Sequence, residues 1–457
     1  MPSPDTLIPI DSIGPSGSYR TRRHTIVKDV RGVPTLRLSL IPRLFLWRSI
    51  SAMHKAAPKS VEKRAEILAK AGEIFSTESI DGMSPDTYQR MVSRICGLPL
   101  YMARKSTEII AESAIKAYQT SAFARPLAAV DDWRAPQTLD GGAVWVRRGN
   151  IFGVLASGNT PSVHSLWLEA LALGYKVVVR PSQREPLTPY RLIRALHMAG
   201  FDTDQIMFLP TNHAEAEDIV EASDLSIVYG GDAMVQKYHN RPTVLTEGPG
   251  RSKILITEDA WQESMDMIIE SVAGKGATNC INTTAIFVEG DPAPFAKALA
   301  DRLAKMPSHP PDHDKAILPV QQLDQALALE NLLHQRALGT KPILNEVVHD
   351  LGDGAAVLRP AVFLLNDPNA SQTRVELPFP CVWVAPWSKD YGIPPLKDTL
   401  VLTAITRDEE LIDSLLNEPS ILNLYLGNTP TTFLEPGIPH DSYLGEFLMR
   451  TKGVARN

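Results

Sequence analysis

The middle of the chain alternates between short apolar runs and longer segments in which apolar residues recur every three or four positions. The runs NIFGVLAS, YKVVVRPS and LSIVYGG are typical of buried strands, and the segment TPYRLIRALHMAG has the period of a helix. Strands that alternate with helices indicate a parallel sheet with helical crossovers. The pattern therefore predicts an α/β domain in this part of the chain.

The segments before this domain have different patterns. Near the N-terminus, TIVKDV and TLRLSL are candidate short strands, and between about residues 44 and 122 the period becomes helical. In VEKRAEILAKAGEIF the apolar residues fall along one face of a helix. The next residues, 123–148, lose this period, and the stretch GGAVWVRRG predicts an extended arm or hairpin.

A second alternation begins with the strand SKILIT, the helix WQESMDMIIESVAG and the strand AIFVEG. It weakens after residue 296 but continues to LVLTAIT. The predicted fold class is therefore α/β with two parallel-sheet domains, whose boundary lies near Gly250. The length of 457 residues supports two domains, since a single core rarely grows this large.

Composition and charge exclude several classes of protein. The net charge of −6 and the lack of a basic run argue against a nucleic-acid partner and against a membrane surface. Three cysteines, far apart in the sequence, argue against a disulfide framework and against a zinc site. No secretory leader opens the chain, and no apolar stretch approaches the roughly 20 residues of a membrane helix. We therefore expect a cytoplasmic protein without a metal site.

One cysteine stands out by its position. Cys280 lies in GATNCINTTAIFVEG, between the predicted helix and strand of the second domain. A lone cysteine in such a place is more often a buried apolar residue than a nucleophile. The other two, Cys96 and Cys381, lie in apolar segments and are expected to be structural. For Cys280 the neighbouring motifs change this interpretation.

These motifs follow one another in a fixed order. SGNTP, a helix with a tryptophan and the strand end RPSQ come first, and TEGPGRSKILI, the Cys280 segment and VELPFPCVWV follow. In this order and spacing the chain resembles the aldehyde dehydrogenase superfamily from about residue 44 to its end. The corresponding superfamily motifs are a Pro-Trp-Asn-Phe-Pro turn, a strand ending in Lys-Pro-Ser-Glu, Leu-Glu-Leu-Gly-Gly and Glu-Glu-Ile-Phe-Gly-Pro-Val.

The resemblance implies a division of the chain. A Rossmann-like cofactor domain would comprise residues 1–136 and 149–250, and an oligomerisation arm residues 137–148. A catalytic domain would comprise 251–430, and a C-terminal return segment 431–457. Because members of the superfamily add the arm to a partner's sheet, the resemblance implies a homodimer or homotetramer.

Three residues acquire catalytic roles through the resemblance. Cys280 matches the nucleophile, and a thiolate attacks carbonyl carbon readily and forms a thioester that is easily broken. The side chain of Asn159 and the backbone N–H of Cys280 would stabilise the oxyanion, although Asn159 taken alone is more typical of a turn residue. Glu247 matches the glutamate that serves as general base.

The resemblance also implies a nicotinamide cofactor, NADP(H) or NAD(H). Gly230 and Gly231 occupy the place of a strand-to-helix turn that approaches the pyrophosphate, but Val235 replaces the second glycine of that turn. A plain turn is the alternative interpretation.

Four further positions match cofactor contacts. In RPSQ, Arg180 and Gln183 replace the superfamily's Lys and Glu on either side of Ser182. A glutamine does not repel a 2′-phosphate and an arginine binds one, so this pair favours NADP(H). Glu376 falls on the glutamate that holds the nicotinamide ribose.

The direction of the chemistry is open between two reactions. In one, NAD(P)H reduces an acyl thioester of coenzyme A or a carrier protein to an aldehyde through an acyl-cysteine. In the other, NAD(P)+ oxidises an aldehyde to a carboxylic acid, with Glu247 activating water. Leu168 in place of a lysine, two missing aromatic residues in the SGNTP turn and no Gly-Gln before Cys280 favour thioester reduction, as in the fatty acyl reductases of bacterial bioluminescence.

A different class of function is a binding or scaffold subunit that has lost its chemistry, and the joint occurrence of Cys280, Asn159 and Glu247 argues against it. Other polar residues have plainer interpretations. His164 is expected to be a packed core residue. His440 and Asp441 are expected in a solvated last loop, and the alternative is that this loop borders the substrate mouth.

Overall fold

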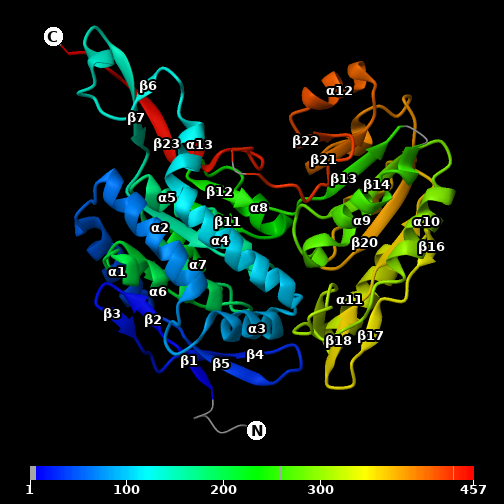
Figure 1. The fold of residues 1–457 in the computed structure, drawn as a ribbon, viewed down its shortest axis with the longest axis horizontal. Helices are drawn as coiled ribbons and strands as arrows, with labels where there is room; N and C mark the ends of the chain where they lie inside the picture. Colours follow the sequence, from blue (N-terminus) through cyan, green and yellow to red (C-terminus); the bar gives the residue numbers. More distant parts are fainter. Residues whose placement is uncertain (1–6, 258–259, 436, 457) are drawn as a thin grey trace.

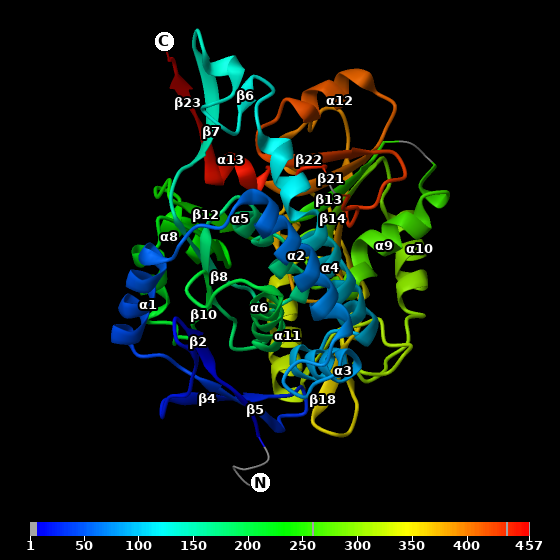
Figure 2. The same cartoon turned by 60° about the vertical axis from the view of Figure 1, so that its left-hand side comes forward.

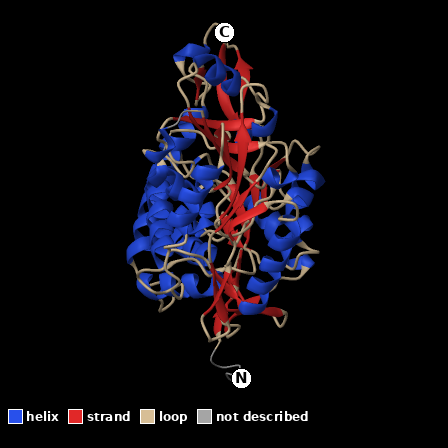
Figure 3. Cartoon of the chain, turned by 90° about the vertical axis from the view of Figure 1, so that its right-hand side faces the viewer, coloured by secondary structure: helices blue, strands red, loops and turns tan. Residues whose placement is uncertain are grey.

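The computed structural model describes residues 7–257, 260–435 and 437–456. Two lobes, each built on a seven-stranded sheet, lie side by side, and a narrow arm projects from the first lobe beside the C-terminus (Figure 1). Seen from the side, helices lie on both sides of the strands (Figure 3). The two parallel-sheet domains expected from the sequence are thereby confirmed.

The sheet of the first lobe has the order β12-β11-β8-β9-β10-β2-β3, in which the first five strands are parallel and the last two antiparallel. The antiparallel edge comes from the N-terminus, where the sequence pattern is too short to predict it. A small sheet, β1-β5-β4, lies beside it and contains both N-terminal strands that the sequence predicts. The bounds are β1 Ile8–Ile10, β2 Ser12–Gly14, β3 Gly17–Tyr19, β4 His24–Lys28, β5 Pro34–Ser39, β8 Ile151–Leu155, β9 Lys176–Arg180, β10 Ile206–Phe208, β11 Leu225–Tyr229 and β12 Val244–Glu247.

Both faces of this sheet are covered, which explains the continuous apolar runs of its strands. Along β9, Val177 and Val179 pack into one core and Val178 into the other. Helices α2 to α6 contribute to the first core, and α1 and α7 to the second. The helix bounds are α1 Arg43–Lys55, α2 Val61–Thr77, α3 Pro85–Cys96, α4 Leu100–Ser121, α5 Leu168–Ala172, α6 Leu187–Ala199, α7 Ala216–Ala222 and α8 Asp232–Tyr238.

One predicted helix is shorter than its pattern suggests. The segment VHSLWLEALALG forms a 3₁₀ turn at Pro161–Ser165 and then the short helix α5. Its end is as predicted, because Gly174 has φ of +91° and stops the helix. Buried Trp167 donates a 3.0 Å hydrogen bond to Nδ1 of His164, which makes His164 a packed core residue, as expected.

The sheet of the second lobe has the order β16-β19-β20-β14-β13-β21-β22, with only β16 antiparallel. Helices α9 and α10 cover one face, and α11 and α12 the other. A three-stranded sheet, β15-β18-β17, adjoins it. The bounds are α9 Met265–Ala273, α10 Ala293–Leu303, α11 Leu323–Arg336, α12 Glu409–Leu416, β13 Ser252–Ile256, β14 Thr283–Glu289, β15 Val320–Gln322, β16 Lys341–Leu344, β17 Val348–Asp350, β18 Ala355–Leu358, β19 Ala361–Leu364, β20 Cys381–Trp387, β21 Thr399–Ile405 and β22 Ile421–Leu426.

The arm joins the middle of the sequence to its end. β7 (Gly142–Arg147) pairs along its length with β23 (Met449–Val454) and more briefly with β6 (Ala129–Val130). The short helix α13 (Leu444–Leu448) leads into β23 at the base of the arm (Figure 2). The extended arm predicted around GGAVWVRRG is therefore a three-stranded sheet. In the described residues, no helix combines the length and apolar character needed to cross a membrane.

Candidate active site

Cys280 lies in the loop between α9 and β14. The chain reaches it through a tight turn in which Lys275, Gly276 and Ala277 all have positive φ. Such backbone conformations cost free energy for residues other than glycine, and they concentrate at functional sites. Cys280 is half-buried, and it packs beside the apolar cluster of Ile281, Leu400 and Val401.

The backbone of Cys280 is held against the segment that follows Glu247. A Cβ atom on Gly250 would lie only 1.8 Å from the carbonyl oxygen of Cys280, so only glycine allows this approach. The Oγ atom of Ser252 donates a 2.9 Å hydrogen bond to the same carbonyl. The motif TEGPGRS therefore fixes the position of the nucleophile as well as that of the glutamate.

Asn282 fixes the loop from the other side. Its side-chain amide donates to the carbonyls of Ser271 and Gly274, at 3.3 and 2.9 Å, and its Oδ1 accepts the N–H of Asn279 at 3.0 Å. The first two bonds tie the loop to the end of α9, and the third lies within the loop. The sequence does not predict a role for Asn282. Its position, two residues after Cys280, is the one sequence feature that marks it.

Asn159 comes from the first lobe and meets this loop. Its Nδ2 donates a 2.8 Å hydrogen bond to the carbonyl of Thr278, and the Thr278 hydroxyl donates back to the Asn159 carbonyl at 3.2 Å. Asn159 therefore lies beside the nucleophile loop, as the resemblance implies. Since an amide nitrogen carries two hydrogens, one N–H is left for a second acceptor.

We expect Asn159→Ala to lower kcat by about 10²- to 10³-fold, the usual cost of losing one oxyanion donor. Asn159→Asp, which keeps the size but removes the donor, should do the same. Cofactor affinity, measured by fluorescence titration, should not change in either variant. An Asn159→Ala enzyme with full activity would assign this residue to the turn alone.

Glu247 ends β12 and lies beside Tyr229 at the end of β11. Its carboxyl group lies close enough to that of Asp441 for each to shift the pKa of the other. Burial, followed by the negative charge of Asp441, raises the pKa of Glu247 well above the usual value. Burial likewise raises the pKa of Asp441. Since two neighbouring carboxyl groups cannot both ionise cheaply, one of the pair tends to keep its proton.

The solvated loop expected for His440 and Asp441 is wrong. The loop folds back into the site, where Asp441 adopts φ of +71° and its backbone N–H donates a hydrogen bond to Oδ1 of Asn423 at 3.3 Å. His440 is enclosed, and burial lowers the pKa of its imidazole to about 4. No local pattern predicts this return, because Asp441 comes 194 residues after Glu247 in the chain, the difference of the two residue numbers.

The charges around the thiol are negative. Burial raises the pKa of Cys280 to about 12, and the carboxylates of Glu376, Glu247 and Asp441 add to the shift. The thiolate is thus disfavoured until a positive group binds nearby or the neighbouring carboxylates are protonated. The other two cysteines are fully enclosed, burial also raises the pKa of each thiol, and both are structural as expected.

We expect Asp441→Asn to change the part of the pH–activity profile in which activity rises with pH. This rise should move to lower pH by roughly one unit. Removal of the neighbouring charge lowers the pKa of Glu247, so its base form is present at lower pH. The rate of Cys280 alkylation by iodoacetamide should shift in the same direction, because Asp441 also raises the pKa of that thiol. Profiles that superimpose with those of the unaltered protein would show that the two carboxyl groups titrate independently.

Glu376, expected to hold the nicotinamide ribose, lies between the lobes. Its Oε2 accepts the backbone N–H of Arg251 at 2.9 Å. Arg251 in turn forms an ion pair at 2.5 Å with Asp232, the first residue of α8. Glu376 thus lies near both Cys280 and the start of α8, where the cofactor contacts are predicted.

Arg180 is buried rather than a solvated residue at the end of β9. Only 6% of its surface is exposed, and its Nε has no hydrogen-bond partner among the residues that the structure describes. Nη2 lies 3.4 Å from Nδ1 of His213, and Gln183 donates a 3.4 Å bond to the carbonyl of Thr211 nearby. Ser182 faces Gly158, where a Cβ would lie 2.4 Å from the serine Oγ. A buried guanidinium with an unused donor fits an anionic group of a cofactor.

The loop before α8 leaves free space beside one of its two glycines, and a helix side chain fills the space beside the other. A Cβ on Gly231 would meet nothing within 4 Å, while one on Gly230 would meet Met234 at 2.6 Å. Val235 fills the place of the missing glycine and packs toward Gly248, whose added Cβ would lie 2.7 Å from it. The turn can approach a phosphate at Gly231, and the two glycines stay a prediction for that role.

Comparisons with known proteins agree with this geometry. A family model described as the aldehyde dehydrogenase family matches residues 48–391. No curated protein sequence matches the chain. Among solved structures, an Escherichia coli NADP-dependent enzyme is 14% identical, with a TM-score of 0.83 and 99% of each chain covered.

Two other structures are similar to the same degree. An aldehyde dehydrogenase from Physcomitrella patens in complex with the reaction product succinate is 16% identical, with a TM-score of 0.82 and 98% of each chain covered. Betaine aldehyde dehydrogenase from Staphylococcus aureus, in complex with NAD+, is 16% identical, with a TM-score of 0.82 and 97% of this chain and 95% of that one covered. At these identities the structures show a shared fold over nearly the whole chain.

Proposed function

The chain belongs to the aldehyde dehydrogenase family and is an NAD(P)-dependent oxidoreductase of it, and from this premise we propose that it oxidises an aldehyde to a carboxylic acid through a covalent intermediate on Cys280. One observation carries the proposal. A thiol, an amide donor and a carboxyl group from three separate segments converge at one loop, in Cys280, Asn159 and Glu247.

In the proposed reaction the Cys280 thiol releases its proton to solvent, and its Sγ atom adds to the aldehyde carbon. The carbonyl oxygen becomes negative and accepts the free N–H of Asn159 and the backbone N–H of Cys280. A nicotinamide held beside Glu376 would supply the hydride acceptor, and Cys280 would then carry a thioester. The positive charge of the oxidised ring would also offset the three carboxylates that disfavour the thiolate.

Glu247 completes the cycle by accepting a proton from the water that attacks the thioester. Its raised pKa makes it a strong base once deprotonated, but its own proton must first leave. We therefore place the onset of this step above the ordinary glutamate pKa of about 4.3. The acyl group leaves as a carboxylic acid, and Cys280 recovers its thiol.

For the cofactor, we propose NADP(H) ahead of NAD(H). The support is Arg180, a buried guanidinium with an unpartnered Nε, next to Gln183 in place of a glutamate. Arginine binds phosphate by paired N–H donors, and a neutral amide does not repel it. Glu376 is the proposed partner of the ribose hydroxyls, and Ser182, Gly230 and Gly231 line the path between.

Thioester reduction is the second candidate, for one reason. Glu247 is paired with Asp441 and tends to be protonated, so near neutral pH it is a poor base for water. A slow hydrolysis step would let an acyl-cysteine persist until NAD(P)H reduces it. The narrower resemblance to acyl thioester reductases gains no support from the comparisons, because none of the three relatives above is named as one.

A single-turnover assay separates the two reactions. The protein is mixed with NADP+ or NAD+ and a panel of aldehydes, and in parallel with NADPH or NADH and acyl thioesters of coenzyme A or a carrier protein. Formation of NAD(P)H with acid as product supports oxidation. Consumption of NAD(P)H with aldehyde as product, or no change in either arm, overturns it.

For the assembly, we propose a homodimer or homotetramer held by the arm. Within the described residues, β23 pairs only with β7, so the outer backbone edge of β23 is free to add to another sheet. Mass measurement by light scattering tests this, and a single species of about 50 kDa would contradict it.

A further inference from the structure

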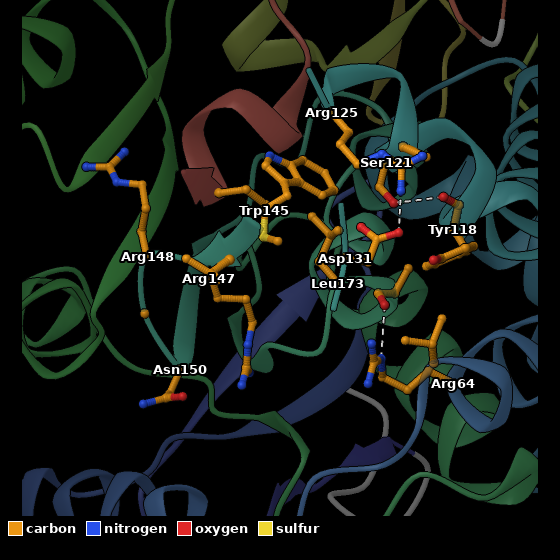
Figure 4. A pocket seen from close by; sticks show the side chains of 16 residues that line it. Arg64, Tyr118, Ser121, Arg125, Asp131, Trp145, Arg147, Arg148, Asn150 and Leu173 are labelled. Atoms are coloured by element: carbon orange, nitrogen blue, oxygen red, sulfur yellow. Dashed lines mark hydrogen bonds and ion pairs between the residues drawn. The ribbon is translucent and has the colours of Figure 1, made fainter. Parts of the chain in front are cut away.

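A cavity lies at the base of the arm, apart from the proposed active site. Its volume is about 500 Å³, within the range of small-molecule sites. Segments from α2, the ends of α4 and α5, and β7 surround it (Figure 4). No residue that we place in the active or cofactor site lines it.

The charge of the cavity wall is strongly positive. Four arginines and one aspartate line it, an excess of three positive charges in a chain whose net charge is −6. The aspartate, Asp131, is paired with Arg125. In the described part of the chain no carboxylate pairs with the other three, Arg64, Arg147 and Arg148. Such an excess favours an anionic ligand.

Two of these arginines converge on one turn. The Nε atom of Arg64 donates a 2.9 Å hydrogen bond to the carbonyl of Ala172, and Arg147 donates to that of Gly174. A Cβ on Gly174 would lie 3.2 Å from the Arg64 guanidinium carbon, so the turn also packs against that side chain. Both guanidinium groups are thus anchored by backbone carbonyls at the end of α5.

The hydrogen bonds to backbone carbonyls give Arg64 and Arg147 a structural role, but they do not explain why two positive charges lie close together. Burial lowers the pKa of Arg64, and the charge of Arg147 lowers it further. Each guanidinium has five N–H donors, and the carbonyls use one or two of them. Two like charges held together with spare donors gain from an anion between them, and arginine binds phosphate in bidentate fashion.

The remaining wall suits the organic part of a ligand. Tyr118, Trp145 and Leu173 lie around the cavity (Figure 4). We propose that this cavity is a second binding site, which takes a small organic phosphate whose phosphate group lies between Arg64 and Arg147. Because Arg147 belongs to β7 and Arg64 to α2, such a ligand joins the arm to the first lobe.

The test uses calorimetry on the full-length protein, with phenyl phosphate as probe at constant ionic strength and the cofactor site saturated with NADP+. We expect binding, and a rise of Tm with probe concentration, since a ligand that binds the folded state stabilises it. Arg147→Gln should weaken the affinity by roughly 10-fold or more, the loss of one charged bidentate contact. Arg450→Gln, on the exposed face of β23, is the matched control and should bind as the unaltered protein does.

A second variant covers the case in which Arg147→Gln fails to fold. Asn150 lines the cavity, its side chain forms no hydrogen bond within the described ranges, and Asn150→Asp adds a repelling charge at the same size. It should weaken binding several-fold and leave Tm without probe unchanged. The proposal is overturned if the unaltered protein binds no probe up to about 10 mM, as when a second copy covers the cavity. Equal affinity in Asn150→Asp and the Arg450→Gln control also overturns it.

Discussion

Cys280→Ala is expected to lower kcat/KM for the proposed substrates by about 10⁴-fold or more, because no other described thiol lies in the site and covalent catalysis ends without it. The affinity for the cofactor should change little. The reduced nicotinamide absorbance in steady-state turnover gives the first quantity, and fluorescence titration the second. Alkylation by iodoacetamide, followed by intact mass, should lose one modified site.

Cys96→Ala is the matched control for this variant. Cys96 is buried in the first lobe, where its Sγ donates to the carbonyl of Val92 at 2.9 Å. The change leaves a small cavity, so it is expected to lower stability by about 1 kcal/mol and to leave turnover intact. A Cys280→Ala protein that kept its turnover would remove the covalent mechanism altogether.

The periodic elements were predictable because each is decided locally. The strands β8, β9 and β11 have continuous apolar sequences since both faces are covered, and the periodic segment of α2 buries Ile67, Leu68 and Ala71. Locally ambiguous segments were harder. Pro161 and the buried pair of His164 and Trp167 break a helix that its apolar period alone predicts to be continuous.

The candidate site was predictable only where a residue matches a motif. Cys280, Asn159 and Glu376 were found in this way, and the structure places all three around the junction of the lobes. Asp441 and Arg147 were not, because each acts through a partner distant in sequence. A solvated aspartate and a buried one have the same local sequence, and only the return of the last loop decides between them.

Glu247→Gln is expected to separate the two halves of the proposed reaction. Glutamine keeps the size of the side chain and can still donate a hydrogen bond to Asp441, but it cannot accept a proton from water. Hydride transfer should proceed, so one equivalent of NAD(P)H should form per Cys280 in a rapid burst. The following turnover should fall by about 10²- to 10⁴-fold, and the acyl-enzyme should accumulate and be visible by intact mass.

Glu185→Gln provides the control, since Glu185 is also buried with a pKa raised to about 7 by burial, yet it caps the start of α6 by accepting the N–H of Thr188. Its burst and turnover should match those of the unaltered protein. If Glu247→Gln turns over aldehyde at the full rate, water is activated by another group, and the pairing with Asp441 then has a role outside hydrolysis. If the burst itself disappears, Glu247 acts before the thioester forms, as the proton acceptor of Cys280.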